Sequence, residues 1–381
     1  MSEPPAAALD APLDPPGPLR ALLEIYDEGF TCDTWGGVET ALWHLAEGLR
    51  EHGVEAEFYR STEGADLGAL AGRVVRERVD AVFPLVESPL FAGGAGGADG
   101  TGEADGASCA DRAGTAADED RPDVRELRRR VVRIWHDVSR LSPDLSTPAP
   151  CPVHTPEAAA PSGGACTAAG VFPDGPAREV FLRDLPWTRC FGSRTYIPWA
   201  VDHLPPADLR DPFGPVLLQL GKTSVDQARV CLERLTGAGL PVRVVFATWS
   251  KEGRAARELV APYAASGAVE VLDSYDIRTE WKRVYAGARL FVLPSVFHET
   301  FNFAAAEALQ LGLPVATLGD CGALADFASL RAETVAQLMD AVVARGESVR
   351  PARRPWTGWR EVAHRYATLI AAPRRAPALG V

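Results

Sequence analysis

The sequence predicts an α/β protein of two doubly wound domains, in which two parallel β-sheets face each other across a cleft. Short apolar strands alternate with amphipathic helices along most of the chain, which is the pattern of parallel sheets covered on both faces. At 381 residues the chain is long for a single hydrophobic core. A proline-rich stretch at 194–212 interrupts the alternation, and a second alternating set follows it.

The first set of elements forms the predicted N-terminal domain, residues 19–203. It follows a Pro/Ala-rich opening at 1–18 that we expect to be disordered. The segment "GGVETALWHLAEGLREHG" at 36–53 predicts an amphipathic helix, because its apolar residues recur at helical spacing and Gly53 can end it. The predicted strands of this domain are 19–28, 54–61, 80–86 and 131–138.

Two segments of this domain lack the apolar residues that a core needs. Residues 91–120 contain seven acidic residues and one Arg, and we expect a disordered insertion at 91–121. Residues 146–170 are rich in Pro and Ala and predict a second loose segment. The acidic stretch carries half of the net charge of −12, so the folded remainder is only mildly acidic.

The second set of elements forms the predicted C-terminal domain, residues 204–350. Its predicted strands are 214–221, 242–248, 269–274, 290–296 and 313–318. Its predicted helices are 226–237, 252–265, 278–288 and a segment that starts near Asn302 and ends before Gly312 and Pro314. Two such α/β units leave a cleft at the carboxyl ends of their strands, where ligands bind.

Composition excludes several classes of protein. The net charge of −12 argues against non-specific nucleic-acid binding. The seven Cys form no CxxC pair, and we find no secretory leader and no apolar run that could span a bilayer, so we expect reduced thiols in a cytoplasmic protein. Cys151, His154 and Cys166 could approach a metal, but a structural zinc site needs a fourth ligand, and we expect no metal.

Two acidic residues stand in an otherwise apolar passage, "FVLPSVFHETFNFAAAEALQLGLPVAT" at 291–317. Glu299 lies in the turn between a predicted strand and a helix, and Glu307 lies inside that helix. The start of such a helix attracts phosphate through its free N–H groups. Carboxylates on either side of a phosphate site can accept hydrogen bonds from sugar hydroxyls, which is the layout that a nucleotide-sugar requires. Each acid alone is more simply interpreted as a solvated helix-face residue or an N-cap neighbour.

The segment "ETFNFAAAEALQLGLPV" at 299–315 resembles the E-x7-E signature of retaining glycosyltransferases of family 4 (group 1), which have the GT-B fold. Four further segments are similar to this family in the same order, namely 36–59, 196–202, 284–295 and 355–370. The resemblance implies two Rossmann-like domains and a C-terminal helix, within 351–381, that crosses back onto the N-terminal domain.

The resemblance also implies roles for individual residues. Glu307 is expected to bind the ribose of the donor, Glu299 the transferred sugar, and His136 to face the reacting sugar. Lys222 and the amide groups before the helix are expected to meet the diphosphate. The residues implied as catalytic are His136, Glu299 and Lys222. The residues implied as donor-binding are Gly36, Gly37, Lys222, Thr300, Phe301, Asn302, Phe303 and Glu307.

The cations that face the diphosphate depart from the family pattern. The family carries an Arg and, five positions later, a Lys, where this chain has Lys222 and Gln227. A Lys provides a point charge where an Arg would bind two oxygens. Arg229 or Lys251 could supply the second charge, and spacing does not decide between them.

Two further departures lie in the backbone segments near the cleft. Asn302 stands where the family prefers Gly, and we expect the turn to survive because Asn tolerates the left-handed backbone conformation. Trp199 and Ala200 stand where the family has Asn and Gly.

The predicted activity is transfer of a hexose or N-acetylhexosamine from a nucleoside-diphosphate sugar, preferably a UDP-sugar, to a hydroxyl of a natural product or saccharide. The resemblance implies front-face attack with retention and no metal or other cofactor. Two alternatives stay open. One is a GT-B-like binding or scaffold subunit that has lost turnover. The other is a lipid-directed enzyme that uses the basic run "RELRRRVVR" at 125–133 to contact a membrane surface.

Overall fold

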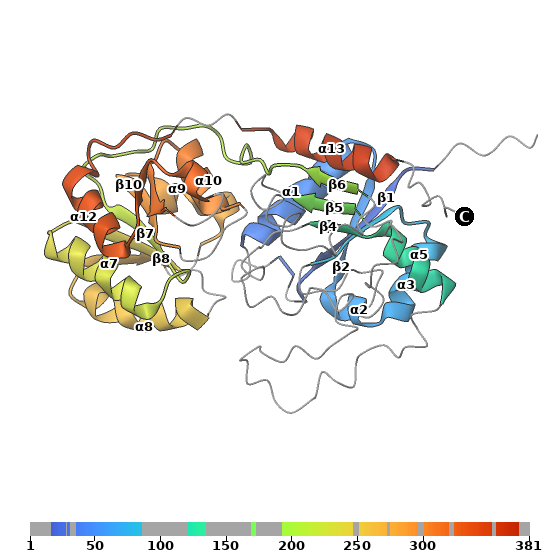
Figure 1. The fold of residues 1–381 in the computed structure, drawn as a ribbon, viewed down its shortest axis with the longest axis horizontal. Helices are drawn as coiled ribbons and strands as arrows, with labels where there is room; N and C mark the ends of the chain where they lie inside the picture. Colours follow the sequence, from blue (N-terminus) through green and yellow to red (C-terminus); the bar gives the residue numbers. More distant parts are fainter. Residues whose placement is uncertain are drawn as a thin grey trace, which may run out of the picture.

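The computed structural model describes residues 17–27, 29–30, 36–85, 121–134, 169–172, 193–246, 251–272, 275–295, 301–319, 324–352 and 356–372. These residues form two α/β lobes, joined by two segments that run between them (Figure 1). Arg210 on the first segment donates to the carbonyl groups of Gly346 and Glu347 on the second, so the two segments lie side by side.

The N-terminal lobe is built on parallel strands. They are β1 (Arg20–Ile25), β2 (Glu55–Arg60), β3 (Ala81–Phe83), β4 (Val132–Ile134), β5 (Ala169–Phe172) and β6 (Ser193–Tyr196). They pair in the orders β2-β1-β3 and β4-β5-β6, and a parallel bridge from Val82 to Val131 joins the two sets. β2 alternates exposed and buried residues, as an edge strand with one solvated face should. Ala169 and Gly170, which we expected in a loose segment, begin β5, so that prediction is wrong for these two residues.

Four helices of this lobe lie in the described chain, namely α1 (Gly37–Glu51), α2 (Ser61–Ala65), α3 (Leu67–Arg76) and α5 (Pro122–Arg130). The predicted helix at 36–53 is confirmed as α1, and Gly53 follows it with a φ of 78°. The basic run at 125–133 belongs mostly to α5, where Val124 and Leu127 are buried and Arg130 pairs with Glu126. This helix therefore packs against the lobe and does not present all its sides to solvent. The predicted segments at 91–121 and 146–170 lie largely outside the described residues.

The C-terminal lobe is a doubly wound parallel sheet. Its strands are β7 (Val216–Leu220), β8 (Val242–Phe246), β9 (Val269–Leu272), β10 (Leu290–Leu293), β11 (Val315–Leu318) and β12 (Leu330–Ala332), in the spatial order β12-β11-β10-β7-β8-β9. β10 and β11 are buried at every residue, because helices cover both faces. Its helices are α7 (Val225–Gly237), α8 (Lys251–Ala265), α9 (Ile277–Tyr285), α10 (Phe303–Gln310), α11 (Leu324–Phe327) and α12 (Val335–Arg345).

The predicted return of the C-terminal helix is confirmed. Helix α13 (Trp359–Ala371) lies on α1 of the N-terminal lobe (Figure 1). A Cβ added to Gly48 of α1 would lie 2.5 Å from Cβ of Ala363, so the two helices meet closely because Gly48 has no side chain. Asp202 caps α13 by accepting the backbone N–H of Trp359 at 2.8 Å. The domain boundary at 203/204 stays a prediction.

One apolar cluster runs through both lobes. It contains Leu23 of β1 and Phe291 of β10, together with Trp199, Phe303 and Trp359. Burial of such side chains contributes about 1.5–3 kcal/mol each, so this cluster ties the lobes together. Within the described chain, no helix is both long enough and apolar enough to cross a bilayer.

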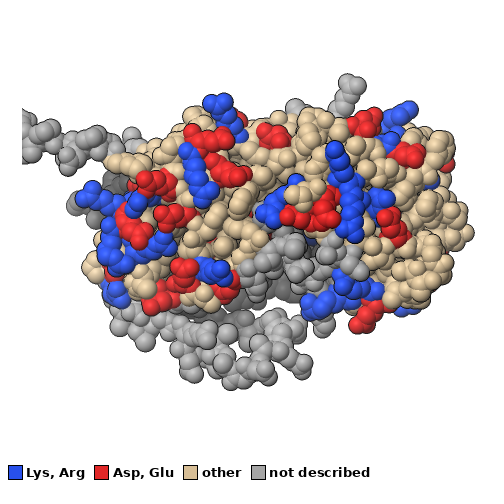
Figure 2. Space-filling view, turned by 180° about the vertical axis from the view of Figure 1, so that it is seen from behind, with Lys and Arg blue, Asp and Glu red and all other residues tan. Residues whose placement is uncertain are grey.

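The surface charge of the described residues is mixed. Figure 2 shows one face of the molecule, on which Lys and Arg lie among Asp and Glu. Exposed pairs such as Arg234 with Asp340 and Arg283 with Glu280 illustrate this mixture. This face does not present the broad basic patch that nucleic-acid binding requires.

Candidate functional site

The order of strands locates a crevice in the C-terminal lobe. The chain winds outward from β7 to β9 on one side and from β10 to β12 on the other, so the direction of winding reverses between β7 and β10. Ligands of such sheets bind outside the carboxyl ends of the strands at this reversal. β7 and β10 pair in parallel, with Val216 opposite Leu290. Lys222, just beyond β7, and the residues before α10, just beyond β10, therefore belong to the same edge of the sheet.

Helix α10 starts at this crevice with a well-formed N-cap. Asn302 accepts the backbone N–H of Ala305 on its side-chain oxygen at 2.9 Å, and it is buried. Its φ is −116°, which is extended backbone. Our expectation that Asn302 serves a left-handed turn is therefore wrong, and Asn302 instead caps the helix. The other N–H groups of the first turn give this helix end its partial positive charge.

Glu307 lies one turn into α10, and its carboxylate is almost fully buried, with 4% of the side chain exposed. One oxygen, Oε1, lies 3.1 Å from Nε2 of His203, and the other, Oε2, accepts the hydroxyl of Tyr285 at 2.8 Å. The interpretation of Glu307 as a solvated helix-face acid is therefore wrong. A carboxylate offers about four acceptor positions, and these two contacts leave acceptor capacity for further hydroxyl groups.

Two tyrosines beside Glu307 remain hydrogen-bond donors. Burial raises the pKa of Tyr285 well above its ordinary value, and the charge of Glu307 raises it further. Burial and then Glu307 also raise the pKa of Tyr275. Neither hydroxyl ionises near neutral pH, so Tyr285 keeps the proton that it donates to the carboxylate of Glu307.

His203 connects Glu307 to the interface between the lobes, and sequence reasoning missed it. The indole N–H of Trp359 donates to Nδ1 of His203 at 3.2 Å. The ring of His44, on α1, stacks on His203 with ring centroids 4.8 Å apart. No local pattern marks His203, because its partners lie far from it in the chain.

The predicted glycine pair lies where the two lobes touch. Gly36 is the N-cap of α1 and donates its backbone N–H to Glu39 at 2.8 Å. Burial raises the pKa of Glu39. A Cβ on Gly37 would lie 3.1 Å from the ring of Phe303, so this glycine allows α1 to approach α10 closely. Two predicted donor-binding residues, Gly37 and Phe303, are thereby brought together.

The departure from the family pattern at Trp199 has a structural reason. The ring of Trp199 is buried and stacks on Tyr366 of α13, with centroids 5.8 Å apart and an interplanar angle of 13°. It also lies beside Trp359 and Phe303, at 5.7 Å and 6.5 Å. Trp199 therefore fills the core between the lobes. The rings of Phe301 and Phe303 meet edge to face at 4.9 Å, which continues this aromatic layer towards the crevice.

Lys222 and Gln227 stand where the family has an Arg and a Lys, and the structure gives a reason for Gln227. Lys222 is half-buried just beyond β7. Gln227 forms a capping box at the start of α7, where its side-chain oxygen faces Ser224 and Thr223 and its backbone N–H donates to Ser224 Oγ. It therefore stabilises a helix end. Arg229 is exposed on α7.

The remaining predicted residues lie outside the part of the chain that the structure describes. They are His136, Glu299, Thr300, the side chain of Lys251, and the set Cys151, His154 and Cys166. In the described residues, no three His, Cys, Asp or Glu side chains are placed to hold a metal ion.

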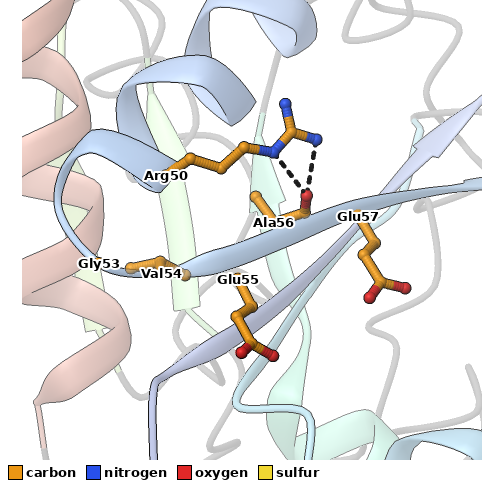
Figure 3. Close-up of a pocket in the computed structure, with 6 residues that line it drawn as sticks. All are labelled: Arg50, Gly53, Val54, Glu55, Ala56 and Glu57. Atoms are coloured by element: carbon orange, nitrogen blue, oxygen red, sulfur yellow. Dashed lines mark hydrogen bonds between the residues drawn. The ribbon is translucent and has the colours of Figure 1, made fainter.

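A separate depression of about 420 Å³ lies at the amino end of β2 (Figure 3). Arg50 donates twice to the carbonyl oxygen of Ala56, and Glu55 pairs with Arg20. This depression is at the opposite edge of the sheet from the cleft, because it adjoins the turn that leads into a strand. Its charged groups are paired, so we do not regard it as the functional site.

Known proteins resemble this chain over most of its length. The family described as "Glycosyl transferases group 1" matches residues 219–344. The chain is 59% identical over 365 residues to the UDP-GlcNAc:ribostamycin N-acetylglucosaminyltransferase of Streptomyces fradiae, an alignment that covers 95% of this chain and 92% of that protein.

Solved structures resemble the fold at low sequence identity. HepE of Anabaena in complex with UDP-glucose is 13% identical, with a TM-score of 0.52 over 92% of this chain and 95% of that one. A glycosyltransferase of Rickettsia africae is 11% identical, with a TM-score of 0.53 over 93% of each chain. A UDP-GlcNAc 2-epimerase of Methanocaldococcus jannaschii is 10% identical, with a TM-score of 0.52 over 92% of this chain and 99% of that one. Because an epimerase shares the fold, the fold alone does not define the reaction.

Proposed function

The chain belongs to the group 1 (family 4) glycosyltransferases and has their GT-B fold, and from this premise we propose that it transfers N-acetylglucosamine from UDP-GlcNAc to a hydroxyl of an aminoglycoside. One observation carries the proposal, which is the 59% identity to the ribostamycin-modifying enzyme over nearly the whole of both chains. The proposal narrows the predicted hexose or N-acetylhexosamine to one sugar and the predicted natural product to one class.

The charge of the chain supports a polyamine acceptor. Aminoglycosides carry several protonated amines at neutral pH, and the chain has a net charge of −12, half of it in residues 91–120. An acidic protein attracts such a cation over distances of about 8–10 Å at physiological salt. This attraction favours encounter, while the contacts that select the acceptor hydroxyl belong to the cleft.

The donor would be held at the crevice between β7 and β10. Glu307 would accept the ribose hydroxyls, and the start of α10 with the amides of 301–303 would face the diphosphate. Lys222 would lie on the other side of the diphosphate, since it follows the neighbouring strand. Glu299 and His136 would face the transferred sugar, as the resemblance implies. Gly36 and Gly37 would keep the first loop free of side chains near the donor.

Retention follows from attack on the same face as the leaving group. The bond between the anomeric carbon and the β-phosphate oxygen breaks, and its electrons leave with UDP. The acceptor oxygen forms the new bond to that carbon, and its proton passes to the leaving phosphate. The enzyme's contribution would be charge stabilisation at the leaving phosphate, because the helix end and Lys222 gain interaction energy as negative charge develops there.

The proposal is tested with purified protein, UDP-GlcNAc and ribostamycin, with the product analysed by mass spectrometry. We expect one added N-acetylhexosaminyl group, and an NMR coupling at the new linkage that matches the donor's configuration. UDP-glucose, UDP-galactose and GDP- and dTDP-sugars serve as donor controls, and a neutral disaccharide as the acceptor control. Glu307→Gln should react poorly with every donor.

Two results would contradict the proposal at different levels. Release of UDP without transfer to any aminoglycoside would contradict the proposed acceptor and would leave the proposed donor unaffected. Transfer from a different sugar nucleotide at a higher kcat/KM than from UDP-GlcNAc would contradict the proposed identity of the donor.

A further inference from the structure

A chain of two hydrogen bonds runs from the C-terminal helix to the candidate donor site. Trp359 Nε1–H donates to Nδ1 of His203 at 3.2 Å, and Nε2 of His203 lies 3.1 Å from Oε1 of Glu307. Both His203 and Glu307 are almost fully buried, with 5% and 4% of the side chain exposed. Water therefore has little access to replace either bond.

The indole of Trp359 determines which ring nitrogen of His203 carries the proton. Trp can only donate, so Nδ1 of His203 must accept and carries no proton. The ring proton is then on Nε2, from which it donates to Glu307. The contact of His203 with Glu307 is therefore a hydrogen bond from a neutral ring, and its direction is fixed by Trp359. A histidine held in one tautomer by the partner of its other nitrogen is a common way to orient a third group.

The same histidine is enclosed by parts of the molecule that meet between the lobes. Trp359 is the first residue of α13, which packs on α1, and the ring of Phe303 is parallel to its indole within 5°, with centroids 6.2 Å apart. His44 of α1 stacks on the imidazole, with ring centroids 4.8 Å apart. The position of His203 thus depends on the docking of α13 and α1, while its Nε2 reaches into the C-terminal lobe.

We propose that His203 is a positioning residue that, held as the Nε2–H tautomer by Trp359, fixes the orientation of Glu307 for the ribose of the donor. The proposal rests on the proposed role of Glu307 in donor binding. It makes donor affinity dependent on how the C-terminal helix is docked. His203 would not touch the donor, and its effect would pass through the carboxylate alone.

The expected kinetic effect follows from where Glu307 acts. Ribose hydroxyls do not change during the reaction, so a contact to them stabilises the ground state and the transition state equally. A misoriented Glu307 should therefore raise KM for UDP-GlcNAc and leave kcat nearly unchanged. Loss of one hydrogen bond of ordinary strength corresponds to a change of about three- to tenfold.

The tautomer is measured directly by NMR on protein labelled with 15N-histidine. The chain has seven His, and the signal of His203 is assigned by its absence in His203→Gln. At neutral pH we expect a protonated Nε2 and an unprotonated Nδ1 in the wild type, and a mixture of tautomers in Trp359→Phe. A wild-type His203 protonated at Nδ1 would overturn the proposal, whatever the activity of the enzyme.

Kinetics test whether the tautomer matters for the donor. Trp359→Phe keeps an aromatic ring and removes the indole N–H together with the five-membered part of the ring, and we expect KM for UDP-GlcNAc to rise about three- to tenfold with kcat within about twofold. His203→Gln keeps one donor and one acceptor and should be less affected than His203→Phe. The matched control is Trp281→Phe, which removes an indole N–H on α9 and should leave KM unchanged.

The outcomes separate this proposal from the proposed function. Wild-type protein that neither binds UDP by calorimetry nor consumes UDP-GlcNAc would refute the donor role of Glu307 and with it the kinetic part of the inference. An active wild type with unchanged KM in Trp359→Phe would overturn the inference alone. A fall in thermal stability and kcat with unchanged KM would also overturn it, because it would indicate a purely structural contact.

Discussion

The hydroxyl of Tyr285 donates to the carboxylate of Glu307 across 2.8 Å, and both side chains are buried in the C-terminal lobe. The bond joins α9 to α10, which follow one another in the chain on either side of β10. A buried carboxylate depends on such donors, because an unsatisfied charge in this environment is costly. Loss of this hydrogen bond should therefore affect both the stability of the C-terminal lobe and the orientation of Glu307 in the candidate site.

Tyr285→Phe should lower the free energy of unfolding by about 1.5–3 kcal/mol, because it leaves a buried carboxylate without one of its donors. The measurement is urea denaturation followed by circular dichroism. Tyr366→Phe is the matched control, since Tyr366 is equally buried and its hydroxyl has no hydrogen-bond partner among the described residues. That change should be neutral or slightly stabilising. Equal effects of the two substitutions would contradict the role given to Tyr285.

Lys222→Ala should reduce kcat by about 10²-fold or more, because a cation beside the leaving diphosphate is worth most in the transition state. Lys222→Arg should retain activity, since an Arg can bind two phosphate oxygens. Steady-state kinetics at saturating UDP-GlcNAc provide the measurement. Lys282→Ala on α9 is the charge-matched control and should behave like the wild type. A kcat of Lys222→Ala equal to wild type would direct attention to Arg229 or Lys251.

Gly48→Ala should destabilise the contact between α1 and α13, because the new Cβ would lie 2.5 Å from Cβ of Ala363. We expect a loss of about 1–3 kcal/mol in the free energy of unfolding, the usual cost of overpacking. Gly237→Ala is the control, since a Cβ there meets nothing within 4 Å and Ala favours the helix. Thermal unfolding of both variants should show opposite shifts of Tm. A Gly48→Ala protein as stable as the wild type would mean that the helices separate easily.

The pH dependence of stability should reflect His44. Burial, followed by the neighbouring His203, lowers the pKa of His44 to about 3 from 6.5. Glu47 lies 3.3 Å from His44 Nδ1 and favours the proton, but it is half-exposed, so burial decides the direction. The folded state thus binds fewer protons than the unfolded state between these values. Stability is complete above pH 6.5 and falls as pH decreases below it, by up to about 1.4 kcal/mol per pH unit.

His44→Phe keeps a ring against His203 and removes the titrating group. Denaturation curves measured from pH 7 to pH 4.5 should therefore show a shallower loss of stability in His44→Phe than in the wild type. Parallel curves for the two proteins would show that His44 takes up its proton without unfolding.

Much of the fold could be predicted because its signals are local. The apolar runs at 216–220 and 290–293 and the helix after Gly36 each carry their own pattern, and they are confirmed. β5 and β6 were missed, because each has only four residues and no distinct apolar pattern. The crossing of α13 onto α1 came from the family resemblance and not from any local pattern.

The site was less accessible to sequence reasoning, because its contacts are long-range. His203 lies 104 positions from Glu307 and 156 from Trp359, so no spacing rule could group them. The replacement of the family's Asn-Gly by Trp199 and Ala200 also has its reason in distant rings, those of Tyr366 and Trp359. The assignments of His136, Glu299 and Thr300 stay predictions.

The packing of α13 on α1 has a consequence for how the protein is made. His52, just after α1, contacts the carbonyl of Arg360 in α13, and these residues are 308 positions apart in the chain. A ribosome adding about 5–20 residues per second would expose α1 for roughly 15 to 60 seconds before α13 is synthesised. During that time the side of α1 around Gly48 cannot be covered by its native partner. The nascent chain should then be a substrate for chaperones that bind apolar helices, and release should coincide with the arrival of the last helix.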